Sequence, residues 1–296
     1  MKPRSKRFMP ASQPFTRLCQ LAGRSRSSGR ADLHVHTTCS DGNYTPAEIV
    51  DLARRTGLSA LAITDHDTLE GIAPARSAAR GLGLDIVPGV EITAEHLGRE
   101  LHLLAYYVDP EDGALLAALR DLRQHRKDRF WDMAERLRHC GVTLDEEELR
   151  AEAAVGVVGR RNLATLLVKA RRAGSVREAF QRWLGDGGRV TLPNVRLPIA
   201  DAIRLTRDAG GVASWAHPPA NATRETLVGL CKLGLQAVEA SYPTFRTRWS
   251  KQLRDWAAEL GLAVTGGSDC HGPGRDLGVC SVTAEELAEL RSLATA

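Results

Sequence analysis

The stretch Asp32-Leu33-His34-Val35-His36 lies near the start of a chain of 296 residues. One residue separates its two histidines, and at this spacing a β-strand directs both side chains to the same face. Near the other end of the chain, Asp269 and His271 have the same spacing. Imidazole and carboxylate groups are ligands that metal ions commonly use, so we expect a metal site to which both ends of the chain contribute.

Further potential ligands lie in or directly after short apolar runs between these two ends. A single histidine at a strand end is more often a structural residue, but the shared placement of six of the 9 histidines favours metal binding. Imidazole with carboxylate and without thiolate suits borderline divalent ions such as Zn, Mn or Fe. The candidate ligands are His34, His36, Asp41, His66, Glu91, His102, His217, Asp269 and His271.

The apolar runs alternate with helical patterns, which is typical of parallel β/α units. Thr45-Pro46-Ala47-Glu48, for example, has the N-cap residue, the proline and the acidic first turn of a helix start. In such units the functional groups gather at the carboxyl ends of the strands, so we expect the candidate ligands on one face. Strands are expected at 31–36, 58–64, 84–88, 100–108, 212–216, 237–240 and 262–265, and the later helices at 198–209, 223–233, 247–260 and 284–294.

Residues 109–188 interrupt this alternation. Segments 115–140 and 162–173 have helical patterns, an acidic stretch covers 145–152, and no strand-like run of convincing length separates them. We therefore expect a helical insertion of subdomain size over 109–188, which would cover the substrate. The barrel would then consist of a first part, 31–108, and a second part, 189–296.

Charge is distributed unevenly along the chain. Residues 1–30 carry +8 and no acidic group, so the +4 of the whole chain leaves −4 on residues 31–296. The basic segment is expected to be a disordered leader, and the acidic remainder argues against binding of long duplex DNA. No apolar run approaches the roughly 18 residues of a membrane helix. Six scattered cysteines without a C-x-x-C pair or secretory leader favour reduced thiols and a cytoplasmic location.

Several short motifs occur in an order that resembles the PHP (polymerase and histidinol phosphatase) family of metal-dependent phosphoesterases. The resemblance covers residues 31–296 and implies an α/β fold, a distorted (β/α)7 TIM-like barrel that holds three divalent metal ions. Besides the opening stretch, the motifs are Ser40-Asp41-Gly42, Thr64-Asp65-His66-Asp67, Pro88-Gly89-Val90-Glu91-Ile92, His102-Leu103-Leu104, Ala216-His217-Pro218 and Gly267-Ser268-Asp269-Cys270-His271-Gly272.

The resemblance also implies how the ligands divide among the three metals. The first metal would take His34, His36, Glu91 and Asp269. The second would share Glu91 and add His102 and His217, and the third would take Asp41, His66 and His271. Glu91, Asp65 and Asp269 are the carboxylates expected to serve catalysis. Asp41 could instead serve only its Asp-Gly turn, and Asp65 and Asp67 could support the ligands or cap the following helix.

The insertion resembles one branch of the family, whose enzymes act on nucleoside 3′,5′-bisphosphates and on the 5′ ends of short oligoribonucleotides. Arg160 matches a position expected to hold phosphate, and Arg161 and Asn162 are its neighbours in the predicted substrate site. That branch has Arg-Pro-His at these three positions, and a histidine near Phe245 and Arg246. Arg161 or Arg246 would supply the positive charge lost in this chain.

These features predict a metal-dependent phosphoesterase, with Mn²⁺ the expected metal and Zn²⁺ or Fe²⁺ as alternatives. The expected substrate is a small nucleotide or short oligonucleotide, most specifically the 3′-phosphate of a nucleoside 3′,5′-bisphosphate. An activated hydroxide would attack phosphorus in line. Two other interpretations remain open: a phosphatase for histidinol phosphate or another small metabolite, and a PHP module that binds metal without catalysis.

Overall fold

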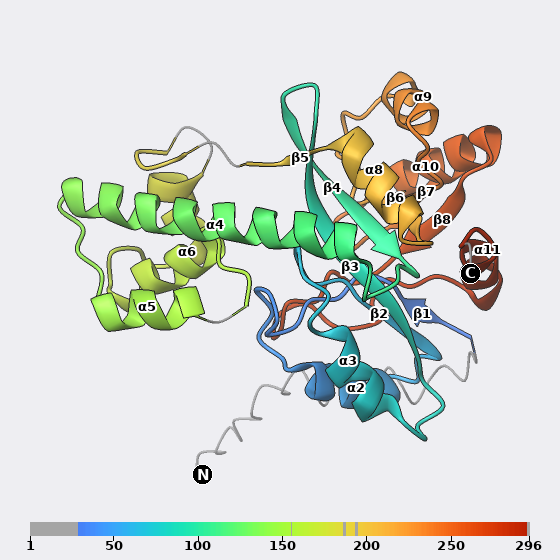
Figure 1. The fold of residues 1–296 in the computed structure, drawn as a ribbon, viewed down its shortest axis with the longest axis horizontal. Helices are drawn as coiled ribbons and strands as arrows, with labels where there is room; N and C mark the ends of the chain where they lie inside the picture. Colours follow the sequence, from blue (N-terminus) through green and yellow to red (C-terminus); the bar gives the residue numbers. More distant parts are fainter. Residues whose placement is uncertain (1–28, 155, 186–187, 193–194, 295–296) are drawn as a thin grey trace, which may run out of the picture.

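One mixed sheet forms the centre of the molecule (Figure 1). The computed structural model describes residues 29–154, 156–185, 188–192 and 195–294, so the leader expected at 1–30 lies almost entirely outside the described residues. Seven strands follow one another in the order β1-β2-β3-β4-β6-β7-β8, and β5 pairs with β3 off this path. Their bounds are β1 Ala31–Asp32, β2 Ala60–Ile63, β3 Asp85–His96, β4 Arg99–Tyr106, β5 Leu197–Pro198, β6 Val212–Trp215, β7 Ala237–Ser241 and β8 Ala263–Gly266.

Backbone contacts between the two ends of the sheet close it into a barrel. The N–H of Leu33 donates to the carbonyl of Gly266 at 3.1 Å, and the N–H of His36 donates to the carbonyl of Cys270 at 3.0 Å. Gly267 is required at this seam, because a Cβ atom there would lie 2.3 Å from the backbone nitrogen of His34. The TIM-like barrel expected from the sequence is confirmed.

The expectation of parallel units throughout was wrong at β4. This strand pairs antiparallel with both β3 and β6, because a tight hairpin at Leu97 and Gly98 joins β3 directly to β4. The early residues of β4 therefore lie at the same end of the barrel as the carboxyl ends of the parallel strands. The nine candidate ligands are called the ligand cluster below. His102 reaches this cluster from near the start of β4, and not from the carboxyl end of a strand.

Helices cover the outside of the barrel, and apolar side chains fill both faces of the sheet, as expected for buried parallel strands. In β2, Leu61 and Ile63 join the larger apolar cluster, while Ala60 and Ala62 join a second cluster. The helix start expected at Thr45 is present in α2, where Thr45 and Glu48 form a capping box. The covering helices are α2 Pro46–Arg55, α3 Ile72–Ala79, α8 Ile199–Asp208, α9 Arg224–Lys232, α10 Thr247–Leu260 and α11 Ala284–Ser292.

The helices of the cap lie to one side of the barrel (Figure 1). They are α4 Gly113–His139, α5 Glu146–Ala154, α6 Arg160–Lys169, α7 Val176–Ala179 and the π-helix η1 Phe180–Leu184. The first half of α4 packs on the barrel through residues such as Leu115 and Leu119, whereas Phe130 and Leu137 in its second half belong to the separate core of the cap. One long helix thus links the two cores. The domain boundaries drawn from the sequence remain a prediction.

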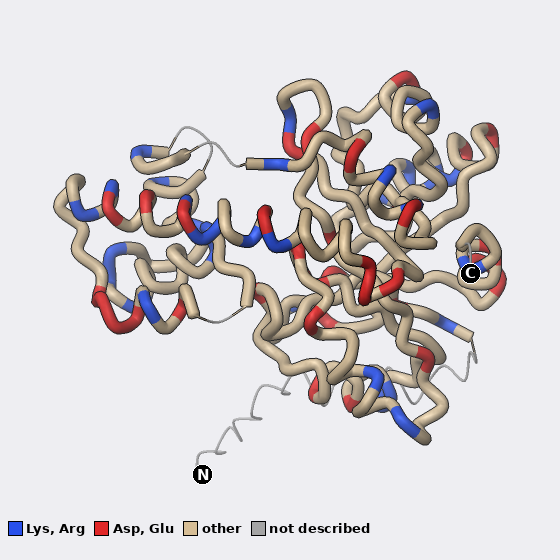
Figure 2. Tube along the Cα trace, in the orientation of Figure 1, with Lys and Arg blue, Asp and Glu red and all other residues tan. Residues whose placement is uncertain are grey.

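Charge on this linking helix is mixed, with Lys and Arg interspersed with Asp and Glu along α4 (Figure 2). No helix within the described ranges is long and apolar enough to span a bilayer.

Candidate metal centre and active site

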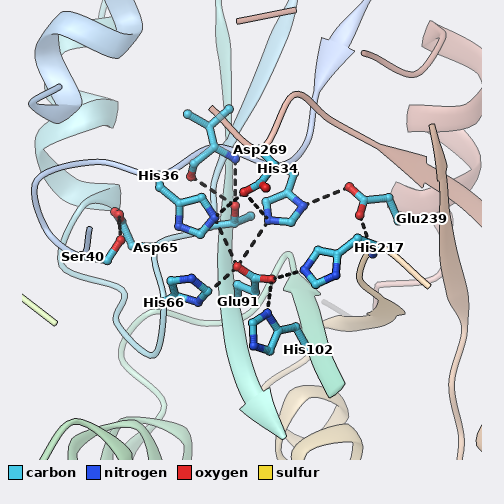
Figure 3. Close-up of polar contacts among 12 residues, drawn as sticks. His34, His36, Ser40, Asp65, His66, Glu91, His102, His217, Glu239 and Asp269 are labelled. Atoms are coloured by element: carbon cyan, nitrogen blue, oxygen red, sulfur yellow. Dashed lines mark hydrogen bonds and ion pairs between the residues drawn. The ribbon is translucent and has the colours of Figure 1, made fainter. Parts of the chain in front are cut away.

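Two buried histidines follow β1 and point into the barrel mouth (Figure 3). Val35, between them, forms a β-bridge with Cys270, so the backbone stays extended past the end of the strand. The Nε2 atoms of His34 and His36 lie 3.3 and 3.2 Å from the same oxygen, Oε2 of Glu91. The inference that both side chains share one face is confirmed.

Glu91 lies at the centre of the cluster (Figure 3). Its Oε2 atom also lies 3.1 Å from Nδ1 of His66. Its Oε1 atom is 2.8 Å from Nδ1 of His102 and 2.9 Å from Nε2 of His217. Since the two oxygens face different sets of imidazoles, Glu91 has the arrangement of a carboxylate that bridges two cations.

A further group of ligand atoms surrounds Asp41. Its Oδ1 atom is 3.2 Å from Nε2 of His271 and 3.8 Å from Nδ1 of His36. His66 completes this group, in which the ligand atoms lie within 4.8 Å of one another. Because the two ring nitrogens of His36 face different groups, this residue connects the third predicted site to the first.

Asp269 has two differently placed oxygens. Its Oδ1 atom faces the imidazoles, 3.2 Å from Nε2 of His36 and 3.4 Å from Nδ1 of His271. Its Oδ2 atom accepts a hydrogen bond from the hydroxyl of Tyr242 at 2.7 Å and another from Arg275. With φ at 50°, Asp269 has the left-handed backbone that non-glycine residues adopt mainly at constrained sites.

The donor set fits divalent cations. Nε2 of His34, both ring nitrogens of His36, Nδ1 of His66 and Oδ1 of Asp41 are buried without a hydrogen-bond partner. Buried polar atoms of this kind are rare unless a ligand satisfies them. Four overlapping groups of residues have the spacing to hold a metal, and together they contain the nine ligands predicted from the sequence. The number and identity of the ions, and the role of each ligand, remain predictions.

Electrostatics in the cluster favour ionised carboxylates. Burial opposes a charged Glu91, but the surrounding His66, His102 and His34 outweigh burial and hold the pKa of Glu91 well below its usual range. Burial likewise opposes a charged His36, yet the carboxylates of Asp269 and Glu91 raise the pKa of His36 to about 10. Protons on the imidazoles and divalent cations therefore compete for the same carboxylates.

Two buried carboxylates that sequence reasoning missed orient these ligands. Glu239 lies 3.0 Å from Nδ1 of His34 through Oε1 and accepts the backbone N–H of His217 at 2.6 Å through Oε2. Asp32 accepts the backbone N–H groups of Ser268 and Gly278 at 2.9 and 2.7 Å. For Glu239 the sequence contained a signal, because a glutamate stands within the apolar strand run at 237–240.

The aspartates beside His66 hold neighbouring loops in place. The alternative role of Asp65 and Asp67 as N-caps of the following helix is wrong, because α3 begins after Gly71 without a side-chain cap. Asp65 instead accepts hydrogen bonds from the backbone and hydroxyl of Thr37, at 2.6 and 2.7 Å, and from Ser40 at 2.6 Å. These contacts fix the loop that leads to Asp41. A catalytic role for Asp65 remains a prediction.

Asp67 connects the barrel to the cap. Its oxygens accept from the backbone of Thr93 at 2.7 Å and from Nε of Arg126 at 2.6 Å. Asp67 is fully buried, and Arg126 belongs to α4. Sequence reasoning missed Arg126, since nothing in the helical pattern of α4 distinguishes it from the other basic residues.

A cavity of about 240 Å³ extends from the ligand cluster to the cap. Asp41, His66 and His102 line it on the barrel side. The lining also contains Arg160 and Arg161, whose contact with substrate remains a prediction, and two arginines of α4 that sequence reasoning missed. The basic residues are Arg126, Arg129, Arg160 and Arg161.

The third predicted substrate residue, Asn162, has its amide engaged by the cap itself. Its Oδ1 atom accepts the backbone N–H of Gly159 at 2.9 Å, and its Nδ2 atom donates to Glu152 at 2.8 Å. Asn162 lines the cavity, but these bonds indicate that it also fixes the start of α6. Contact of Asn162 with substrate remains a prediction. Arg246 lies apart from this cavity, in another depression beside His217 and Tyr242.

Comparison with known proteins gives several matches. The model of the PHP domain matches residues 32–179. The chain is 31% identical over 247 residues to a 5′-3′ exoribonuclease of Haemophilus influenzae, covering 82% of this chain and 90% of the relative. A 3′,5′-nucleoside bisphosphate phosphatase of Chromobacterium violaceum is 30% identical over 83% of this chain and 90% of its own length. A phosphoribosyl 1,2-cyclic phosphate 1,2-diphosphodiesterase of Eggerthella lenta is 30% identical over 81% of this chain and 94% of its own.

A solved structure agrees with these matches. A putative metal-dependent phosphoesterase from Bifidobacterium adolescentis superposes with a TM-score of 0.83 at 29% identity, over 90% of this chain and 96% of that one. The relatives differ in the phosphate compound that their names give, but all are named for the cleavage of a phosphate ester. The chain belongs to the PHP family of metal-dependent phosphoesterases, hydrolases that act on phosphate esters.

Proposed function

We propose that this chain hydrolyses the 3′-phosphate of nucleoside 3′,5′-bisphosphates and also removes nucleotides from the 5′ end of short oligoribonucleotides. One observation carries the proposal: metal-ligating side chains and four arginines line the same cavity. A substrate with two phosphates fits this lining, with one phosphate at the metal ligands and the other among the arginines of the cap. The names of two relatives support the same substrate classes.

Arg129 lies close enough to Arg160 for the two guanidinium groups to repel each other. Burial and the neighbouring Arg160 lower the pKa of Arg129 to about 10. A bound phosphate dianion would relieve this repulsion, and guanidinium groups bind phosphate through paired hydrogen bonds. We therefore assign the phosphate that is not cleaved to Arg129, Arg160 and Arg161, with Asn162 holding Arg160 and Arg161 in position at the start of α6.

We further propose that the nine ligands hold three divalent cations, with Mn²⁺ as the working metal. Cations held there supply Lewis acidity, which activates water and neutralises charge on the phosphoryl oxygens. Glu91 would join two of the sites, because its two oxygens face different imidazoles. Asp269 would join the histidines after β1 to His271, and Asp65 would hold the loop that presents Asp41.

A reduced, cytoplasmic setting is part of the proposal. The cysteines that the structure describes carry free thiols, which suits a reducing compartment. The proposed partners are small nucleotides and short oligonucleotides, because a cavity of about 240 Å³ has no room for a long duplex.

The proposal is tested with purified protein reconstituted with Mn²⁺. It should release phosphate from adenosine 3′,5′-bisphosphate in preference to histidinol phosphate, and activity only on unrelated phosphate esters would reject the substrate assignment. Arg161→Met should weaken binding of the bisphosphate by about 10-fold or more, the worth of a hydrogen bond to a charged group. It should affect adenosine 3′-monophosphate, which lacks the second phosphate, much less. Arg172→Met, an exposed arginine of the cap outside the cavity, is the matched control.

A further inference from the structure

A second, larger cavity adjoins the ligand cluster on the side away from the basic cavity. Its volume is about 510 Å³, within the range of small-molecule sites. It lies between the tip of the β3–β4 hairpin and the segment that leads into α9. The residues that line it are His96, Leu97, Arg99, Glu100, Leu101, His102, Trp215, Ala216, His217, Pro219, Asn221, Ala222 and Thr226.

The two cavities meet at the metal ligands. Glu100 and His102 line both of them, whereas His66 lines only the basic cavity and His217 only the larger one. His66 and His217 lie on opposite sides of Glu91 (Figure 3). A phosphate held at the centre of the cluster would therefore have one cavity on each side.

The linings of the two cavities differ in charge. Four arginines line the basic cavity, but Arg99 is the only Lys or Arg among the residues that line the larger one. Leu97 there is 87% exposed at the hairpin tip and adds apolar surface to the cavity. Asn221 and Thr226 add groups that can form hydrogen bonds. Apolar surface with a few polar groups suits a nucleoside better than a further phosphate.

We propose that the larger cavity binds the second nucleotide of a short oligoribonucleotide, the one on the 3′ side of the phosphate that is cleaved. This inference rests on the proposed function. The first nucleotide would place its 5′-phosphate among the arginines and its 3′-phosphate at the cluster. Water adds to phosphorus, the P–O3′ bond breaks with its electron pair on O3′, and O3′ takes a proton. The phosphate stays on O5′ of the second nucleotide.

The same bond breaks in a nucleoside 3′,5′-bisphosphate, where inorganic phosphate is the second product and the larger cavity is not used. One site would thus serve both substrate classes. The two substrate classes would differ in one contact, which the second nucleoside of the oligoribonucleotide makes beside His217.

The test compares two substrates, adenosine 3′,5′-bisphosphate and 5′-phosphorylated diadenylate, through the ratio of their kcat/KM values. Thr226→Trp fills the cavity, and Leu97→Ala removes the exposed apolar side chain. Each should lower the ratio of diadenylate to bisphosphate by about tenfold, the scale expected from apolar pocket contacts. Lys232→Trp, on the same helix but outside the cavity, and Leu82→Ala, at another exposed leucine, are matched controls that should leave the ratio unchanged.

An equal fall in both kcat/KM values, or the same change in the controls, would overturn the proposal. If the wild-type protein hydrolyses neither compound, the proposed function fails, and isothermal titration then tests the cavity by binding alone. Diadenylate should still bind more weakly to Thr226→Trp than to wild type while the bisphosphate does not. Equal Kd changes for the two ligands would reject the second-nucleotide site.

Discussion

Glu239 holds His34 in one orientation, with Oε1 3.0 Å from Nδ1 of the ring, and both side chains are fully buried. The contact leaves Nε2 of His34 directed at Glu91. A carboxylate on the far nitrogen of a metal-binding imidazole fixes its tautomer and makes it a better ligand. The second oxygen of Glu239 binds the backbone of His217, whose φ of 30° is unusual for a non-glycine residue.

Glu239→Gln should therefore weaken metal binding without unfolding the protein. The amide keeps the size of the side chain but removes its charge, and loss of such a partner typically costs about 10- to 100-fold in metal affinity or activity. Metal titration followed by activity measurement would show the loss. Glu259→Gln, which changes an exposed glutamate paired with Arg224, should have little effect.

Glu91→Gln should abolish turnover. The amide has one oxygen where the carboxylate has two, so it cannot face His66 and His102 with equivalent negative atoms. Elemental analysis of the variant should also show a loss of bound metal. Near-normal rates of phosphate release would contradict the bridging role.

Tyr242→Phe tests whether Asp269 needs its outer hydrogen bond. The hydroxyl donates to Oδ2 at 2.7 Å while Oδ1 faces His36. Removing it should lower metal affinity by about tenfold, in the range for groups that orient ligands. Combining it with Arg275→Met should lower affinity further, because Arg275 donates to the same oxygen. An unchanged metal titration in the double variant would show that backbone geometry alone positions Asp269.

Arg126→Met should destabilise the contact between cap and barrel. It leaves the fully buried carboxylate of Asp67 without its charged partner, and breaking a buried ion pair costs about 3–5 kcal/mol. Denaturant unfolding measures the loss. Arg120→Met is the control, because Arg120 lies on the same helix and is exposed, where an ion pair would be worth about 0–1 kcal/mol.

Metal affinity should rise with pH. The pKa values of His36 and His102 are raised to about 10 by the neighbouring carboxylates, with burial acting in the opposite direction. A cation must displace the protons of His36 and His102 in order to bind. Below pH 10, raising the pH lowers the free energy needed to remove these protons, so metal binding becomes more favourable. Titration calorimetry in buffers of different ionisation enthalpy should detect proton release near pH 7. Metal binding without proton release would contradict this account.

The fold class and the residues that gather as candidate metal ligands could be predicted from the sequence because both depend on local patterns. The spacing of His34 and His36 matches the period of an extended chain, and short motifs with recognisable composition carry the remaining ligands. Helix starts such as Thr45 and Glu48 are equally local, since the residues that form the cap are three positions apart.

Only the tertiary structure identified the groups that hold the ligands in place. Glu239 is 205 residues from His34, and Arg126 is 59 residues from Asp67, so no local pattern connects them. The direction of β4 and the two cavities beside Glu91 likewise depend on how the hairpin and cap pack on the barrel. The sequence by itself determined which fold forms and which residues gather as candidate metal ligands. Packing between distant segments decided how those residues are oriented and what space adjoins them, because burial and long-range contact exist only in the folded chain.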